Sequence, residues 1–330
     1  TVPLAGRITG IVVDGSGAPV KGAEIHYAET SRKQKKEQGS MLAGLFGMQA
    51  APITTGEDGR FSIEGLDPGT YDLRVDTEAL EAGRLQDVQL GEAATAGARL
   101  VVLPEYFPLI SPDETAKIAI RERDGEGPIQ AFLRDTARRH KVWLIGGSCP
   151  LVADVPDKVR NTTLVFDDTG RRVARYDKIL LFGFQKGSER YDESATIEAG
   201  SDVVTFESPC GSVGLSICYD LRFPELYRAM GEVDLIVVPA AFTYTTGRAH
   251  WEVLLRARAI ENQCYVLASA QGGRHPGGRR TWGDSLIIDP WGEVVARLAE
   301  GPGVVVADLD PARIAEVRAS LPALKHRKIS

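Results

Sequence analysis

The sequence predicts two joined parts of different fold class: a small all-β sandwich and, after it, an α/β domain with layered architecture. Up to about residue 90, short alternating apolar and polar segments are separated by turns rich in Gly and Pro. From Gly97 onward, continuous apolar strands appear, and helical stretches lie between some of them. The chain has 330 residues, which is long enough for both parts.

The N-terminal strands are predicted by period-2 alternation between turns. Residues 10–14 and 20–27 alternate in this way, and the turn at residues 15–19 separates them. The segments 54–63 and 66–75 each pass through a turn into a further strand, the second through Asp-Pro-Gly. Turns of this kind between short alternating segments indicate an antiparallel sandwich.

The second part is predicted to alternate strands with helices. We expect strands at residues 100–103, 142–145, 163–166, 213–217, 235–238 and 265–268, and helices at residues 129–139 and 251–262. Strands that are apolar on both faces are those covered by helices, so this part is α/β.

Composition excludes several classes of protein. A net charge of −6 argues against nucleic-acid binding, and no apolar run is long enough to cross a membrane. No signal peptide is visible in the first residues. The four cysteines are widely spaced and include no Cys-x-x-Cys pair, which favours reduced thiols in a cytoplasm over a disulfide framework or a metal site.

Three residues are candidates for chemistry because of where they stand. Cys218 follows a buried strand and precedes Pro224, which is well placed to open a helix. A thiol at such an elbow lies near backbone N–H groups, which favours a nucleophile. Glu105 ends a strand, at the sheet edge where ligands bind in α/β folds. Lys178 follows a strand. Each residue also has an ordinary structural interpretation when it is taken singly. Cys218 could be a small buried apolar residue, Glu105 a solvated residue at a strand end, and Lys178 a surface lysine.

The order of motifs in the N-terminal part resembles the carboxypeptidase regulatory-like, or transthyretin-like, sandwich family. The segments that carry the resemblance are Gly-x-Val, Gly-Ala-Pro-Val-Lys-Gly-Ala, Thr-x-x-Asp-Gly-Arg-Phe and Leu-x-Pro-Gly-Thr-Tyr. It covers most of residues 7–90 and is interrupted by an insertion at residues 31–51. We therefore expect a sandwich domain at residues 1–91, with a scaffold or adhesion role.

Three motifs of the second part resemble the nitrilase superfamily of carbon–nitrogen hydrolases: Leu-Pro-Glu, Tyr-Asp-Lys-Ile-x-Leu-Phe and Cys-Tyr-Asp-Leu-Arg-Phe-Pro-Glu. The resemblance implies a four-layer α-β-β-α sandwich at residues 92–330. It places Glu105 as general base, Lys178 as the cationic group and Cys218 as nucleophile, with Glu193 as a second glutamate near the pocket. The implied reaction is amide hydrolysis through a thioester, without metal or organic cofactor.

Residues 239–293 resemble the Nit branch of that superfamily, and in particular its deaminated glutathione amidases. Those enzymes release 2-oxoglutarate and cysteinylglycine. The ω-amidases, which act on 2-oxoglutaramate, share the oxo-acid end of the substrate and stay as an alternative. The residues expected to bind or support the small amide substrate are Tyr219, Arg222, Phe242, Thr243 and His250, with Arg248 and Arg274 as further cationic candidates. The resemblance also implies a homodimer or a higher homo-oligomer through the hydrolase domain.

The start of the hydrolase domain departs from the family pattern. The family has a strand and a long helix before residue 100, whereas here only residues 92–98 resemble the end of that helix. Either residues 85–90 supply a substitute strand, or this part is incomplete. An inactive scaffold or binding protein with a truncated hydrolase half is therefore the alternative from another functional class.

Overall fold

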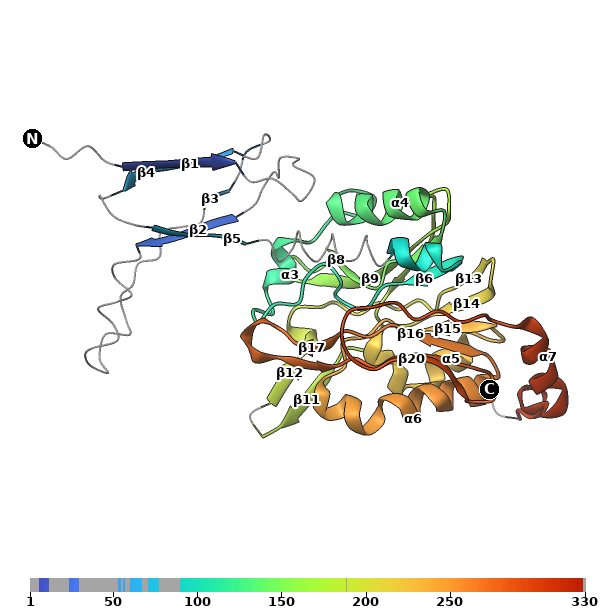
Figure 1. Cartoon of the computed structure of the whole chain (residues 1–330). Coiled ribbons are helices and arrows are strands. Elements are labelled where there is room, and N and C mark those ends of the chain that lie inside the picture. Colours follow the sequence, from blue (N-terminus) through green and yellow to red (C-terminus); the bar gives the residue numbers. More distant parts are fainter. Residues whose placement is uncertain are drawn as a thin grey trace, which may run out of the picture. The chain divides into compact units, whose positions relative to one another are not determined.

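The computed structural model describes residues 6–11, 24–29, 53–54, 56, 60–66, 71–76, 90–187 and 189–328. The chain forms two compact units, Thr1–Arg84 and Leu85–Ser330 (Figure 1). The boundary expected from the sequence lies after Gly91, seven residues later in the chain. The insertion at residues 31–51 lies outside the described residues, and so does nearly all of the substitute strand considered at residues 85–90, of which only Leu90 is described.

The first unit contains two small antiparallel sheets. One pairs β1 (Gly6–Ile11) with β4 (Arg60–Leu66), and the other has β2 (Glu24–Glu29) between β3 (Ile53–Thr54) and β5 (Tyr71–Asp76). In β4 the side chain of Ile63 is fully buried. The predicted all-β sandwich is confirmed.

The first sheet of the second unit has the strand order β10-β9-β7-β6, with β8 also paired to β9. Its strands are β6 (Leu100–Val102), β7 (Trp143–Ile145), β8 (Cys149–Val152), β9 (Val159–Phe166) and β10 (Arg172–Asp177). Strand β6 runs parallel to β7, and among the described residues it has no second neighbour.

The second sheet of this unit has the order β13-β14-β15-β16-β19-β20. Its strands are β13 (Thr205–Ser208), β14 (Gly211–Leu215), β15 (Leu235–Val237), β16 (Tyr265–Ala268), β19 (Ser285–Ile288) and β20 (Val294–Leu298). Two hairpins lie apart from the sheets, β11 (Gly183–Lys186) with β12 (Glu189–Asp192) and β17 (Gly272–Arg274) with β18 (Arg280–Trp282).

The labelled α-helices of the second unit are α3 (Ala116–Ala119), α4 (Pro128–His140), α5 (Pro224–Ala229), α6 (Tyr244–Asn262) and α7 (Pro311–Ser320). In Figure 1, α4 lies on one side of the sheets and α6 on the other. Among the described helices, none combines the length and the apolar composition that a membrane crossing requires.

Alternating side chains divide the interior into two cores. In β7, Leu144 packs with α4, whereas Ile145 belongs to a core shared by both sheets and α6. In β9, Leu164 likewise belongs to the core next to α4, and Val165 belongs to the core shared by both sheets. This alternation is what a strand covered on both faces requires. The order helix, sheet, sheet, helix confirms the predicted four-layer sandwich.

The predicted helices form, and local chemistry sets their ends. Helix α6 begins seven residues before the predicted start at 251, because Thr243 caps it by accepting from the N–H of Thr246. Residues 90–95 are helical and end at Gly97, whose φ of +88° suits the Schellman bonds to Ala94 and Ala93. The predicted helix tail at residues 92–98 is therefore present.

A glycine after β7 allows a close approach to the chain that follows β6. Gly147 has φ +51°, and a Cβ at this position would lie 2.0 Å from the carbonyl oxygen of Pro104. We expect Gly147→Ala to lower the melting temperature of the second unit by roughly 4–10 °C, through overpacking in a conformation that L-residues disfavour. Calorimetry measures the shift. Gly183→Ala, where nothing lies within 4 Å of the added methyl, is the control and should melt as the wild type does. An unchanged melting temperature for Gly147→Ala would contradict the tight contact.

Candidate active site

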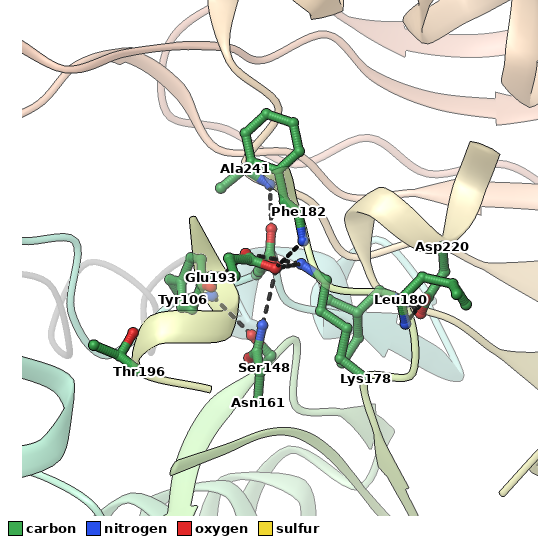
Figure 2. Close-up of polar contacts among 12 residues, drawn as sticks. Tyr106, Ser148, Asn161, Lys178, Leu180, Phe182, Glu193, Thr196, Asp220 and Ala241 are labelled. Atoms are coloured by element: carbon green, nitrogen blue, oxygen red, sulfur yellow. Dashed lines mark hydrogen bonds and ion pairs between the residues drawn. The ribbon is translucent and has the colours of Figure 1, made fainter. Parts of the chain in front are cut away.

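Glu105 stands just beyond β6, and its side chain is 1% exposed. Three donors hold its carboxylate. Lys178 Nζ and Asn161 Nδ2 donate to Oε1 at 2.9 and 3.0 Å, and the backbone N–H of Ala241 donates to Oε2 at 2.8 Å. These donors come from the segment after β10, from β9 and from the segment after β15, so both sheets contribute to its position (Figure 2). A buried carboxylate needs such partners to stay charged.

Lys178 follows β10, and its side chain is fully buried. Its ammonium lies 2.9 Å from Oε1 of Glu105 and 2.8 Å from Oε2 of Glu193. Burial acts to lower its pKa, but the charges of Glu105, Glu193 and Cys218 prevail, so the pKa of Lys178 lies well above its ordinary value. The side chain is therefore a permanent cation inside the protein.

Glu193 begins the short 3-10 helix Glu193–Ala195. Its carboxylate accepts from Lys178, from the hydroxyl of Tyr106 at 2.8 Å and from the backbone N–H of Phe182 at 2.7 Å (Figure 2). Burial acts to raise its pKa, but Lys178 and the hydrogen bonds outweigh burial, so the pKa of Glu193 is lowered. Lys178 is thus one cation held between two carboxylates.

Cys218 lies at the elbow where β14 ends and the 3-10 helix Cys218–Arg222 begins. Its φ is +51°, an uncommon value for a residue with a Cβ, and its N–H donates to the carbonyl oxygen of Pro239 at 2.8 Å. Helix α5 follows directly and has Pro224 in its first turn, as the sequence predicted. Strain of this kind persists where the surroundings fix the backbone, and it is concentrated at functional sites.

Burial keeps the thiol of Cys218 protonated, and the neighbouring carboxylates add to this effect. Burial raises its pKa well above the ordinary value, the charge of Glu105 raises it further, Lys178 opposes this, and Glu193 and a hydrogen bond to Glu105 add to the rise. The thiol is therefore in contact with a carboxylate that can take its proton. The cysteines at positions 149 and 264 are also buried, and burial raises the pKa of Cys264 to about 12.

Asp220 ties the elbow to the Lys178 segment, a role that the sequence analysis missed. Its carboxylate accepts from the N–H of Ile217 at 2.8 Å, the N–H of Leu180 at 2.9 Å and the hydroxyl of Tyr176 at 2.6 Å. Burial raises the pKa of Asp220 to about 6, against the opposing effect of these donors and of Lys178. Its position inside the Cys218 motif was the available signal, but its partners lie 40 and 44 residues away.

Asn161 was missed for a similar reason. It lies on β9, is 2% exposed and stands 56 residues from the carboxylate that it contacts. Its side-chain oxygen, Oδ1, is buried and has no hydrogen-bond partner among the residues that the structure describes. An isolated Asn in a strand gives no signal of such a contact.

Four of the residues expected at the substrate form one neighbourhood beside Cys218. Arg222 lies over the rings of Tyr219 and Phe242, at 5.7 and 5.3 Å, and its NH1 is 3.1 Å from Nδ1 of His250. The ring of Tyr219 also packs edge-on against Phe182 at 5.2 Å.

The remaining candidates lie elsewhere or have structural partners. Thr243 is buried and caps α6. Arg248 and Arg274 are both exposed.

The arrangement provides a thiol, a proton acceptor and a fixed cation inside one buried cluster. Within the described residues, no group of three or more His, Cys, Asp or Glu side chains is placed to hold a metal ion. A thiol next to a carboxylate can lose its proton as it attacks, and a neighbouring cation can stabilise the negative oxygen that then forms. These are the elements of acyl transfer.

Comparison with known families gives two matches. Residues 76–319 match the family described as carbon–nitrogen hydrolase, and residues 7–103 match the carboxypeptidase regulatory-like domain. The deaminated glutathione amidase of Yersinia enterocolitica is 39% identical over 238 residues, which are 71% of this chain and 83% of that protein.

The solved structures that are similar to this chain include those of two proteins whose names describe a nitrilase fusion and an amidase. The Caenorhabditis elegans NitFhit protein has a TM-score of 0.68 at 36% identity; the match covers 77% of this chain and 62% of NitFhit, less than two thirds of that protein. A variant of the amidase from Nesterenkonia sp. AN1 has a TM-score of 0.60 at 26% identity, over 74% of this chain and 91% of that one. In that amidase, acrylamide has undergone Michael addition at the active-site cysteine.

The effect of the Glu193 charge on the pKa of the Cys218 thiol can be measured. In Glu193→Gln one negative charge near Cys218 is lost, so we expect the pKa of Cys218 to fall and its alkylation by iodoacetamide to begin at lower pH. Peptide mass spectrometry against pH follows this one residue. Glu189→Gln is the matched control, because Glu189 contacts Thr245 instead. An alkylation profile that stays in place, or moves to higher pH, would contradict the electrostatic coupling.

Proposed function

The chain belongs to the carbon–nitrogen hydrolase family, and we propose that it cleaves the side-chain amide of deaminated glutathione through a thioester on Cys218. The observation that carries the mechanism is the buried contact of Glu105 with Lys178, at 2.9 Å, beside the Cys218 thiol. The family and the reaction class agree with what the three motifs predicted. The residue roles that follow are part of the proposal.

Glu105 moves the proton at each step. Because the pKa of Cys218 is raised, the resting thiol keeps its proton and passes it to Glu105 as sulfur attacks the amide carbon. The carbon–nitrogen bond then breaks, and Glu105 returns the proton to the departing amine. A water molecule attacks the thioester, its proton passes to Glu105, and the thiol leaves with that proton restored. Each cycle consumes one water and releases one acid and one amine.

Lys178 stabilises the tetrahedral intermediate. The amide oxygen becomes negative when sulfur adds, and the ammonium of Lys178 and the backbone N–H of Tyr219 are the groups proposed to meet that charge. Glu105 and Glu193 already hold the buried ammonium in place, so it does not need to reorganise during the reaction. Electrostatic catalysis is effective because the stabilising charge is positioned in advance.

The substrate is proposed from the relatives and from Arg222. The amidases of Yersinia enterocolitica, Synechocystis and Bos taurus, 39–43% identical to this chain, bear the name deaminated glutathione amidase. That substrate carries a 2-oxo carboxylate, and Arg222 is a cation supported by the rings of Tyr219 and Phe242. Guanidinium groups bind carboxylates through paired hydrogen bonds. The smaller 2-oxoglutaramate carries the same oxo-acid group, so it is the competing substrate.

A cytoplasmic location and self-association through the hydrolase domain complete the proposal. All four cysteines are free, which suits a reducing compartment. On α6, Val253 and Ile260 are 63% and 48% exposed, and Trp291 is 50% exposed. Exposed apolar groups of this size favour contact with a second copy of the domain.

The proposal is tested by comparing two substrates. We expect a higher kcat/KM for deaminated glutathione than for 2-oxoglutaramate, with release of 2-oxoglutarate from both. We expect Cys218→Ala to abolish both reactions, because no other group in the cluster can form the thioester. Cys210→Ala removes a half-buried thiol outside the cluster and is the matched control, which should retain nearly full activity.

Three outcomes would change the assignment. A preference for 2-oxoglutaramate would make the protein an ω-amidase. Equal turnover by Cys218→Ala would reject the thioester mechanism. A folded wild-type protein that hydrolyses neither compound would favour the scaffold alternative.

A further inference from the structure

Tyr106 occupies a constrained position directly after Glu105. Its φ is +55°, in the left-handed region that a tyrosine rarely adopts. Two hydrogen bonds hold it there. Its N–H donates to Oγ of the buried Ser148 at 3.0 Å, and its hydroxyl donates to Oε1 of Glu193 at 2.8 Å (Figure 2). A strained backbone that delivers one hydroxyl to one carboxylate points to a role for that contact.

The contact matters because the cluster has more negative than positive groups. Glu105 and Glu193 share the single ammonium of Lys178, so the three side chains carry a net charge of −1 when all are ionised. Glu193 could relieve this excess by taking a proton, or by drawing Lys178 away from Glu105. Tyr106 opposes both because it adds a donor to Glu193 without adding charge, and a hydrogen bond to a carboxylate favours its ionised form.

The charged groups around this contact come from several elements. Glu193 faces Lys178, with Glu105 and Cys218 beyond it. On the other side of Tyr106, Lys117 lies 5.7 Å from the ring centre, and Arg279 is near enough to act on its hydroxyl. Burial, then Glu193 and Glu105, raise the pKa of Tyr106 well above its ordinary value, although Arg279 opposes this. The hydroxyl therefore stays protonated and remains a donor.

We propose that Tyr106 is a positioning residue, whose hydroxyl keeps Glu193 ionised and in place so that Lys178 remains on Glu105 and beside Cys218. This inference rests on the proposed amide hydrolysis for its kinetic consequence only. The half-buried ring of Tyr106 also lines a shallow pocket with Ser111, Lys117 and Arg279, so a direct contact with substrate is the competing role.

Tyr106→Phe separates the two roles by removing a single oxygen atom. We expect kcat for the amide to fall about tenfold or more, the usual effect of losing a hydrogen bond to a charged group, while KM changes little. The acidic limb of the kcat/KM profile should move to higher pH, because the pKa of Glu193 rises when it loses a donor. Tyr191→Phe is the matched control. Tyr191 packs on Phe182 at 5.6 Å and bonds Glu189, so its profile should stay in place.

A second variant and a second measurement keep the test independent of the substrate. Ser148→Ala removes the acceptor of the Tyr106 N–H. It should also move the acidic limb of the kcat/KM profile to higher pH, by a smaller amount than Tyr106→Phe does. The pH dependence of Cys218 alkylation by iodoacetamide should shift in Tyr106→Phe and not in Tyr191→Phe, whichever amide the protein hydrolyses. If that shift occurs while no amide is turned over by the wild type, the proposed function fails and this inference stands.

Two results would overturn the inference. One is a Tyr106→Phe protein with unchanged kcat, acidic limb and alkylation profile. The other is a rise in KM alone, which would make Tyr106 a substrate contact.

Discussion

The structure of the second unit depends on keeping one ammonium and two carboxylates charged inside the protein. Removing such groups from water costs several kcal/mol for each ion, and only close partners and further hydrogen bonds offset that cost. Lys178 is fully buried, and Glu105 and Glu193 each accept from two more donors besides it. Removing Lys178 would leave two buried carboxylates without a cation. The surrounding fold must therefore bring together groups from β9, from the segments that follow β6, β10 and β15, and from the 3-10 helix Glu193–Ala195.

The four-layer architecture makes this possible. Side chains of β7 and β9 alternate between the helix-covered face and the core between the sheets, so the two sheets pack through apolar contacts. The polar groups of the site lie mainly beyond the ends of the strands. Asp220 then joins the Cys218 elbow to the Lys178 segment through the N–H groups of Ile217 and Leu180. One carboxylate thus connects the segment of the proposed nucleophile with the segment of its cation.

The sequence predicted the layered fold, and it singled out the three residues that are proposed to react, because both leave local signals. Buried strands are continuous apolar runs, and Glu105, Lys178 and Cys218 stand inside motifs that can be compared with a family. The supporting residues leave no such signal. Asn161 and Tyr106 act through side chains 56 and 87 residues away in the chain, a distance that only the fold closes. The start of α6 was placed too late for another reason. Gly247 weakens the helical pattern, and it stands there because a Cβ would lie 2.3 Å from Cβ of Trp282.

If an acyl group passes through Cys218 during the reaction, intact-protein mass spectrometry can detect it. The protein is mixed with deaminated glutathione, quenched rapidly with acid at successive times and weighed. We expect a species heavier by one 2-oxoglutaryl group, which peptide mapping locates to Cys218 and which is missing from Cys218→Ala. Steady release of 2-oxoglutarate with no acyl group on Cys218 at any quench time would contradict the thioester mechanism.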